Sequence, residues 1–178
     1  MREEETLCRP GGFALTDELL RFAGLEKQHA LRVLDVGCGH GASVTYLRER
    51  FPDWRISGLD ADPVLRREGI CETGRAEALP VPDQSLDVIL MECSLSRIGR
   101  PQQALAEALR ALRPDGWLLI SDMYARKKEL GMERGDADGQ EAAGERAGLL
   151  GRLEFSRHIW KRLSQAGFSV LEMEDRSR

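Results

Sequence analysis

The sequence lacks the features that mark several large classes of protein. Its four cysteines, at positions 8, 38, 71 and 93, include no C-x-x-C pair, which argues against a zinc or thioredoxin-like motif. No apolar run approaches the roughly 20 residues of a membrane-spanning helix, and residues 1–12 lack the apolar centre of a secretory signal. A net charge of −4 excludes a basic surplus. We therefore expect a cytoplasmic protein with reduced thiols and neither a membrane nor a nucleic-acid partner.

The length and composition are those of an ordinary globular domain. With 178 residues, 42% hydrophobic and 31% charged, the chain can bury a core. We expect a single domain over 1–178, with its core at about 13–124 and a last helix and strand at 152–178. Residues 125–151 carry six glycines and many charges, so they form either a lid after the fifth strand or a flexible surface insertion.

Strand-like and helix-like segments alternate at short intervals. Near-continuous apolar runs predict strands, and apolar residues at helical spacing predict the helices between them. The expected strands are 31–36, 54–60, 70–74, 86–91, 117–123 and 169–174. The expected helices lie near 15–22, where Thr16 supplies a capping oxygen, and at 42–50, 62–69, 101–113 and 155–168. Runs without polar alternation are typical of strands buried on both faces, which predicts a three-layer α/β/α sandwich with a mostly parallel central sheet.

Three alternating glycines follow the first strand. Gly37, Gly39 and Gly41 leave the backbone bare where a ligand can approach, and the helix after them directs free N–H groups the same way. Asp60 ends the next strand, 23 positions after Gly37. A carboxylate at about that spacing can accept both hydroxyls of a ribose. The arrangement indicates a ligand that contains adenosine.

Two such ligands fit the pattern. Gly37, Gly39 and Ala42 match the looser dinucleotide motif, which favours a nicotinamide cofactor. Asp35, however, would repel a pyrophosphate, whereas it could bind the ammonium group of S-adenosylmethionine directly or through water, unless it only holds the loop in place. The residues favour S-adenosylmethionine over a nicotinamide cofactor but leave both ligands open.

At this point four motifs resemble those of class I S-adenosylmethionine-dependent methyltransferases, in that family's order. They are VLDVGCGHG, ISGLDADP, GRAEALPVPDQSLDVILM and ALAEALRALRPDGWLLISD, and they span roughly residues 31–123. The resemblance implies a Rossmann-like fold and S-adenosylmethionine as cofactor. It places Asp35, Gly37, Cys38, Gly39 and Gly41 around the methionyl part, Asp60 at the ribose, Ala61 and Ala76 at the adenine, and Met91 and Glu92 along the pocket.

Two departures from the family pattern stand out. Arg75 occupies the position of an aspartate that often accepts from the adenine amino group, and arginine cannot accept a hydrogen bond. Glu77 could replace that acceptor, Arg75 could stack on the ring, or the contact is absent. The sequence also stops soon after a sixth strand, where the family usually has a seventh. An exposed sheet edge would then invite pairing with a second copy, as in a homodimer.

These observations predict methyl transfer from S-adenosylmethionine to a small-molecule acceptor. The cofactor already carries an activated methyl group, so the protein mainly positions its substrates. No catalytic base is evident, although Glu92 and Cys93 lie at a strand end, and we expect no metal. Two alternatives remain: a nicotinamide-dependent oxidoreductase, and a non-catalytic module that binds S-adenosylmethionine.

Overall fold

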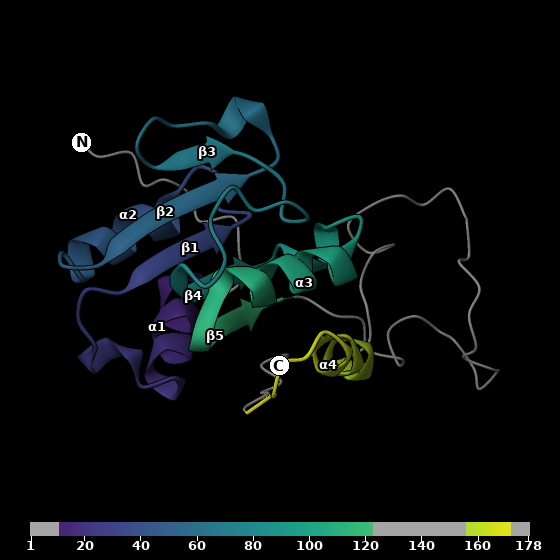
Figure 1. The fold of residues 1–178 in the computed structure, drawn as a ribbon. Helices are drawn as coiled ribbons and strands as arrows, with labels where there is room; N and C mark the ends of the chain where they lie inside the picture. Colours follow the sequence, from purple (N-terminus) through teal and green to yellow (C-terminus); the bar gives the residue numbers. More distant parts are fainter. Residues whose placement is uncertain (1–10, 123–155, 172–178) are drawn as a thin grey trace.

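A computed structural model describes residues 11–122 and 156–171 (Figure 1). Its strands are β1 (Arg32–Val36), β2 (Arg55–Asp60), β3 (Cys71–Thr73), β4 (Leu86–Glu92) and β5 (Leu112–Ser121). Its α-helices are α1 (Gly12–Phe22), α2 (Ala42–Arg50), α3 (Pro101–Ala111) and α4 (Ser156–Gln165). Short 3₁₀ turns are η1 (Leu25–Lys27), η2 (Pro63–Leu65) and η3 (Leu95–Arg97).

The five strands form one sheet in the order β3-β2-β1-β4-β5, and every pair is parallel. The first strand of the chain therefore lies at the centre, between β2 and β4. Asp35 on β1 is opposite Gly58 on one side and Leu90 on the other. The expected parallel sheet is confirmed. Because all strands run the same way, the loops after β1, β2 and β4 emerge at one edge, where ligands bind in open α/β sheets.

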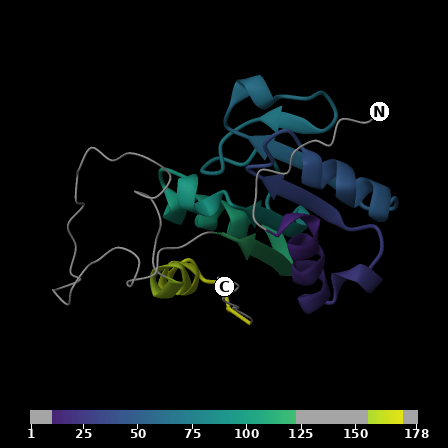
Figure 2. The same cartoon turned by 180° about the vertical axis from the view of Figure 1, so that it is seen from behind.

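Helices cover both faces of the sheet, which confirms the three-layer sandwich. On one face, Leu20 of α1 and Val44 and Leu47 of α2 pack on Val33 and Leu90. Figure 2 shows this face, with α1 and α2 in front of the strands.

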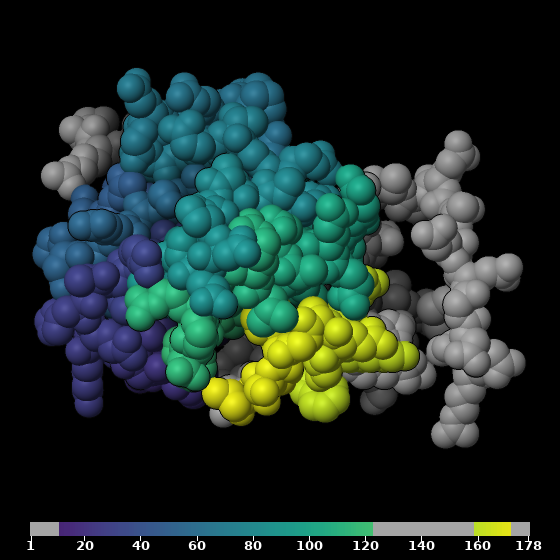
Figure 3. Space-filling model, viewed as in Figure 1, coloured from purple at the N-terminus to yellow at the C-terminus, as the bar shows by residue number. Residues whose placement is uncertain are grey.

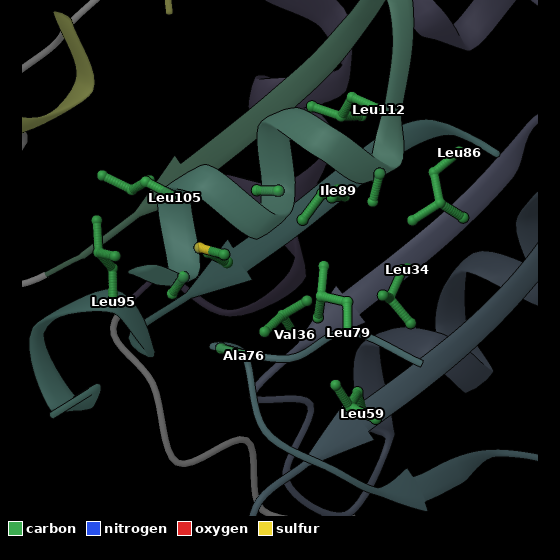
Figure 4. Close-up of a cluster of buried hydrophobic side chains, with 14 of the residues drawn as sticks. Leu34, Val36, Leu59, Ala76, Leu79, Leu86, Ile89, Leu95, Leu105 and Leu112 are labelled. Carbon is green, nitrogen blue, oxygen red and sulfur yellow. The ribbon is translucent and has the colours of Figure 1, made fainter. Parts of the chain in front are cut away.

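On the other face, α3 and α4 cover the alternate strand residues. Leu105 of α3 belongs to the same buried cluster as Leu34, Val36 and Ile89, and the close-up labels all four side chains (Figure 4). Leu163 brings α4 into the same cluster, and Figure 3 shows α4 lying along α3 at the surface. From β5, the partly buried Leu118 and Ile120 pack against this cluster.

Several predictions about the elements are wrong. The expected helix at 62–69 is reduced to η2, because the chain reverses at once and Arg67 bridges to Cys71. The predicted helix 101–113 ends at Ala111, and the turn at 113–116 is an irregularity inside β5, with Asp115 at φ 65°. Leu112 pairs with Leu86 of β4, so β5 begins before the expected turn rather than after it.

Thr16 is not the cap of the first helix. The helix begins four residues earlier, at Gly12, and Thr16 lies in its interior with no exposed surface. It shares a helix face with Leu20, so it is turned toward the sheet.

The remaining expectations fall partly outside the described residues. Residues 169–171 are not in a strand, and 172–174 lie outside the described ranges, as do Cys8 and the segment 125–151. The helix expected at 155–168 is confirmed as α4. No helix within 11–122 or 156–171 is long and apolar enough to cross a membrane.

Candidate functional site

The three glycines of the loop after β1 serve different purposes. All three have positive φ, at 83°, 56° and 79° for Gly37, Gly39 and Gly41. A Cβ on Gly37 would lie 2.4 Å from Cβ of Ser94, and one on Gly41 would lie 2.4 Å from Cγ2 of Ile70. A Cβ on Gly39 would meet nothing within 4 Å. Gly37 and Gly41 are therefore needed for packing, whereas Gly39 faces open space.

Asp60 joins the tip of β2 to this loop. Its Oδ2 accepts from the backbone N–H of Gly39 at 2.9 Å, and its Oδ1 accepts from Asp62 N–H at 3.0 Å. The side chain is half-buried, and Ala61 beside it is exposed. A carboxylate offers about four acceptor positions, so two such bonds leave capacity for hydroxyl groups of a ligand.

Backbone donors of the loop are already engaged. The N–H groups of Gly37 and Cys38 both donate to the carbonyl of Leu59, at 2.7 and 3.2 Å, and that of Gly41 donates to Cys38 O at 2.9 Å. With Gly39 N–H held by Asp60, few loop amides are left to bind a phosphate. This geometry disfavours the pyrophosphate of a nicotinamide cofactor.

Acidic groups set the electrostatic character of the loop. Asp35 is 2% exposed, on the α1 side of the sheet by its alternation with Val33. The pKa of the Cys38 thiol is raised by burial first, then by its hydrogen bond to Cys71, and then by the negative charges of Asp35 and Asp60. Of these causes, the negative charges of Asp35 and Asp60 are the ones that would also favour a cation at this loop.

A buried polar cluster lies at the ends of β4 and β5. Thr16 of α1 donates to Oε1 of Glu92 at 2.9 Å, and both side chains are buried. Ser121 is in register with Glu92 and is 9% exposed. Its hydroxyl has no hydrogen-bond partner within the described part of the chain. We call Thr16, Glu92 and Ser121 the β4–β5 polar cluster.

Sequence reasoning missed two members of this cluster. The sequence predicts Ser121 only as a residue of the fifth strand, and it predicts Thr16 as the cap of the first helix. The available signal was the spacing of Thr16 four residues before Leu20, which puts a polar residue on a buried helix face. Met91 differs from its neighbour Glu92, because its side chain has no exposed surface and packs in the core under α3.

Arg75 and Glu77 form a pair after β3. Arg75 Nη2 donates to Glu77 Oε1 at 3.1 Å, and the Glu77 side chain is only 6% exposed. Burial opposes ionisation of Glu77, but its own backbone N–H and Arg75 outweigh burial and lower its pKa. Glu77 is therefore an ionised acceptor, with Arg75 directed at it. Ala76 between them is buried in the core beside Leu79.

Comparisons with known proteins agree with this geometry. The chain is 36% identical over 116 residues to a fatty-acid O-methyltransferase of Mycolicibacterium smegmatis, covering 60% of this chain and 42% of that protein. It is 37% identical over 105 residues to phthiotriol/phenolphthiotriol dimycocerosates methyltransferase 1 of Mycobacterium ulcerans, covering 52% and 37%. Among solved structures, the cyclase SpnF superposes with a TM-score of 0.71 at 26% identity, covering 89% of this chain and 57% of that one. The chain thus spans less than half the length of these two curated relatives.

The parallel sheet with its glycine loop and acidic strand ends defines the class I, Rossmann-like α/β fold. Residues 34–120 match the family model described as a methyltransferase domain, and the described residues have the Rossmann-like fold of class I methyltransferases. The resemblance seen in the sequence is confirmed.

Proposed function

We propose that this domain binds S-adenosylmethionine at the carboxyl edge of β1 and β2 and transfers the methyl group to a small molecule. The observation that carries the proposal is the position of Gly39. Its Cα faces open space while its N–H is fixed by Asp60, so bare backbone and a carboxylate are presented side by side. An adenosyl amino acid needs both features.

The residues present fit the cofactor. Asp60 would accept from the ribose hydroxyls with its remaining acceptor capacity. Asp35 and Asp60 supply negative potential for a ligand with an ammonium and a sulfonium group. When bound, the cofactor supplies a methyl group already activated for displacement. The protein's own part is to orient the ligand and exclude water.

Glu77 would accept from the adenine amino group in place of the aspartate expected at position 75. Of the interpretations left open by the sequence, the Arg75–Glu77 ion pair favours this one. Arg75 would then orient the acceptor carboxylate rather than contact the ring. The backbone of Ala76 would lie beside the ring edge.

The β4–β5 polar cluster is the best candidate for the acceptor side. Ser94, two residues after Glu92, packs on Gly37 and donates to Val36 O at 2.7 Å, so the cluster adjoins the glycine loop. An acceptor with a hydroxyl or carboxyl group would find a partner in the Ser121 hydroxyl. The two curated relatives are named for methyl transfer to a fatty acid and to phthiotriol dimycocerosates, which supports an organic small-molecule acceptor.

Calorimetry with two ligands tests the cofactor. S-adenosylhomocysteine should bind, and NAD⁺ should not. The reverse result would favour the nicotinamide-dependent oxidoreductase. Gly39→Val should abolish binding, because its branched side chain enters the space that the ligand needs. Gly24→Val is the matched control: it also has positive φ, at 66°, and no atom within 4 Å of its Cβ, but it precedes η1 and lies before β1, whereas Gly39 follows β1.

A second candidate is cofactor binding without methyl transfer. It is favoured by the similarity to SpnF, which is named as a cyclase although it shares this fold. Incubation with S-adenosylmethionine labelled in the methyl group and a panel of hydroxy and carboxylic acids separates the two. Labelled product supports the methyltransferase. Tight binding with no labelled product and no S-adenosylhomocysteine formed would support the second candidate.

A further inference from the structure

Two thiols meet beside the glycine loop. Cys38 follows Gly37 in the loop, and Cys71 is the first residue of β3. Their Sγ atoms are 2.8 Å apart, with the Cys38 thiol donating to that of Cys71. The covalent bond of a disulfide is about 2.05 Å long, so little movement separates this contact from a bond.

Gly58 on β2 makes this meeting possible. Gly58 is the register partner of Cys71, and a Cβ there would lie 2.5 Å from Cys38 Sγ. Because Gly58 has no side chain, the Cys38 thiol lies over β2 and reaches the neighbouring strand. The carbonyl of Leu59 holds Cys38 N–H at 3.2 Å, so the backbone fixes the approach.

The two thiols differ in access to solvent. Cys38 is half-buried, whereas Cys71 has no exposed surface. Burial also raises the pKa of both thiols, with Cys38 raised further by its hydrogen bond to Cys71. An attack from solvent should therefore reach Cys38 first and proceed slowly, while Cys71 is placed to complete the reaction. No group of three metal-ligating side chains occurs in the described ranges, which leaves the dithiol without a third ligand.

We propose that Cys38 and Cys71 are an oxidation site that closes to a reversible disulfide and locks the glycine loop to the edge strand β3. With a peroxide as oxidant, the Cys38 thiolate attacks one oxygen, the O–O bond breaks, and water leaves after taking up the thiol proton. Cys71 Sγ then attacks the sulfur of the resulting sulfenic acid, the S–O bond breaks, and a second water leaves. Two thiols are oxidised and both peroxide oxygens are reduced.

The mechanical consequence follows from the size of β3. This strand has three residues and pairs with β2 alone among the described strands. A bond to the loop joins residues 33 positions apart and reduces the freedom of the unfolded chain. The inference does not depend on the proposed cofactor.

The test uses the full chain with Cys8→Ser and Cys93→Ser, which retains only the two thiols in question. Hydrogen peroxide should remove the mass of two hydrogen atoms and join the Cys38 and Cys71 peptides in a digest. Dithiothreitol should restore the original mass. The oxidised form should melt about 5–10 °C higher than the reduced form. Amide exchange in β3 should slow.

Cys71→Ser in the same background is the matched control, and peroxide should leave its melting temperature unchanged. The inference is overturned if the parent is oxidised only to sulfinic acid at Cys38, or if disulfides form only between molecules. It is also overturned if the joined form melts no higher than the reduced form. Peptide mapping of the parent decides the first two outcomes without relying on the folding of any cysteine-to-serine variant at the pair.

Discussion

Replacing Asp60 tests the geometry of the cofactor site most directly. In Asp60→Ala the N–H groups of Gly39 and Asp62 lose their acceptor, and the ligand loses its ribose partner. A hydrogen bond to a charged group contributes roughly 1.5–3 kcal/mol. Loss of the ribose contact together with the fixed loop should therefore weaken S-adenosylhomocysteine by about 3 kcal/mol or more, or over 100-fold in Kd.

Asp60→Asn should have an intermediate effect. The amide keeps one acceptor oxygen, which cannot serve both backbone N–H groups in the same way. The expected loss is about tenfold in Kd, or about 1.4 kcal/mol. Titration calorimetry with S-adenosylhomocysteine measures both variants, and circular dichroism confirms that each is folded.

Asp62→Ala is the matched control, since it removes the same charge two residues away. Its side chain accepts from Val64 N–H at 2.9 Å at the start of η2, rather than from a backbone N–H of the glycine loop. Affinity should stay within a few-fold of the parent. Wild-type affinity in a folded Asp60→Ala protein would refute the reasoning. Equal losses in Asp60→Ala and Asp62→Ala would show that general negative charge, rather than this carboxylate, matters.

Three further predictions concern stability. Thr16→Val removes the donor to a buried carboxylate and should lower the free energy of unfolding by about 1–3 kcal/mol in urea; Thr16→Ser, which keeps the hydroxyl, should lose less, and equal losses would contradict the hydrogen-bond explanation. Gly37→Ala combines positive φ with a clash against Ser94 and should cost about 2–5 kcal/mol; an unchanged urea midpoint would contradict this. The pKa of Glu107 is lowered from 4.5, chiefly by its hydrogen bond from Arg110, so its stabilisation is present above that pH and lost as pH falls through the lower folded value. Wild type should therefore melt at a higher temperature than Glu107→Gln near about pH 6, and this difference should disappear in acid. A difference in melting temperature that does not change with pH would contradict the prediction.

Much of the architecture could be predicted because local pattern and burial coincide. The expected strands at 31–36, 54–60 and 86–91 contain apolar residues that become buried, and they form the three inner strands β1, β2 and β4. The helix at 42–50 was expected and observed with the same bounds. Predictions failed where pairing with a neighbouring strand overrides the local residue pattern. β5 begins at Leu112 because Leu112 pairs with β4, although the residues that follow are typical of a turn.

In the candidate site, too, local features could be predicted and contacts between elements could not. The glycines, Asp35 and Asp60 could be predicted as candidate site residues from the sequence, because bare backbone and a carboxylate at strand ends are local features with a fixed spacing. Three features became visible only in the folded chain: Gly39 alone of the three glycines faces open space, Thr16 donates to Glu92, and Cys38 contacts Cys71. These contacts join residues from different elements, and their geometry depends on strand register and helix packing, which no local pattern encodes.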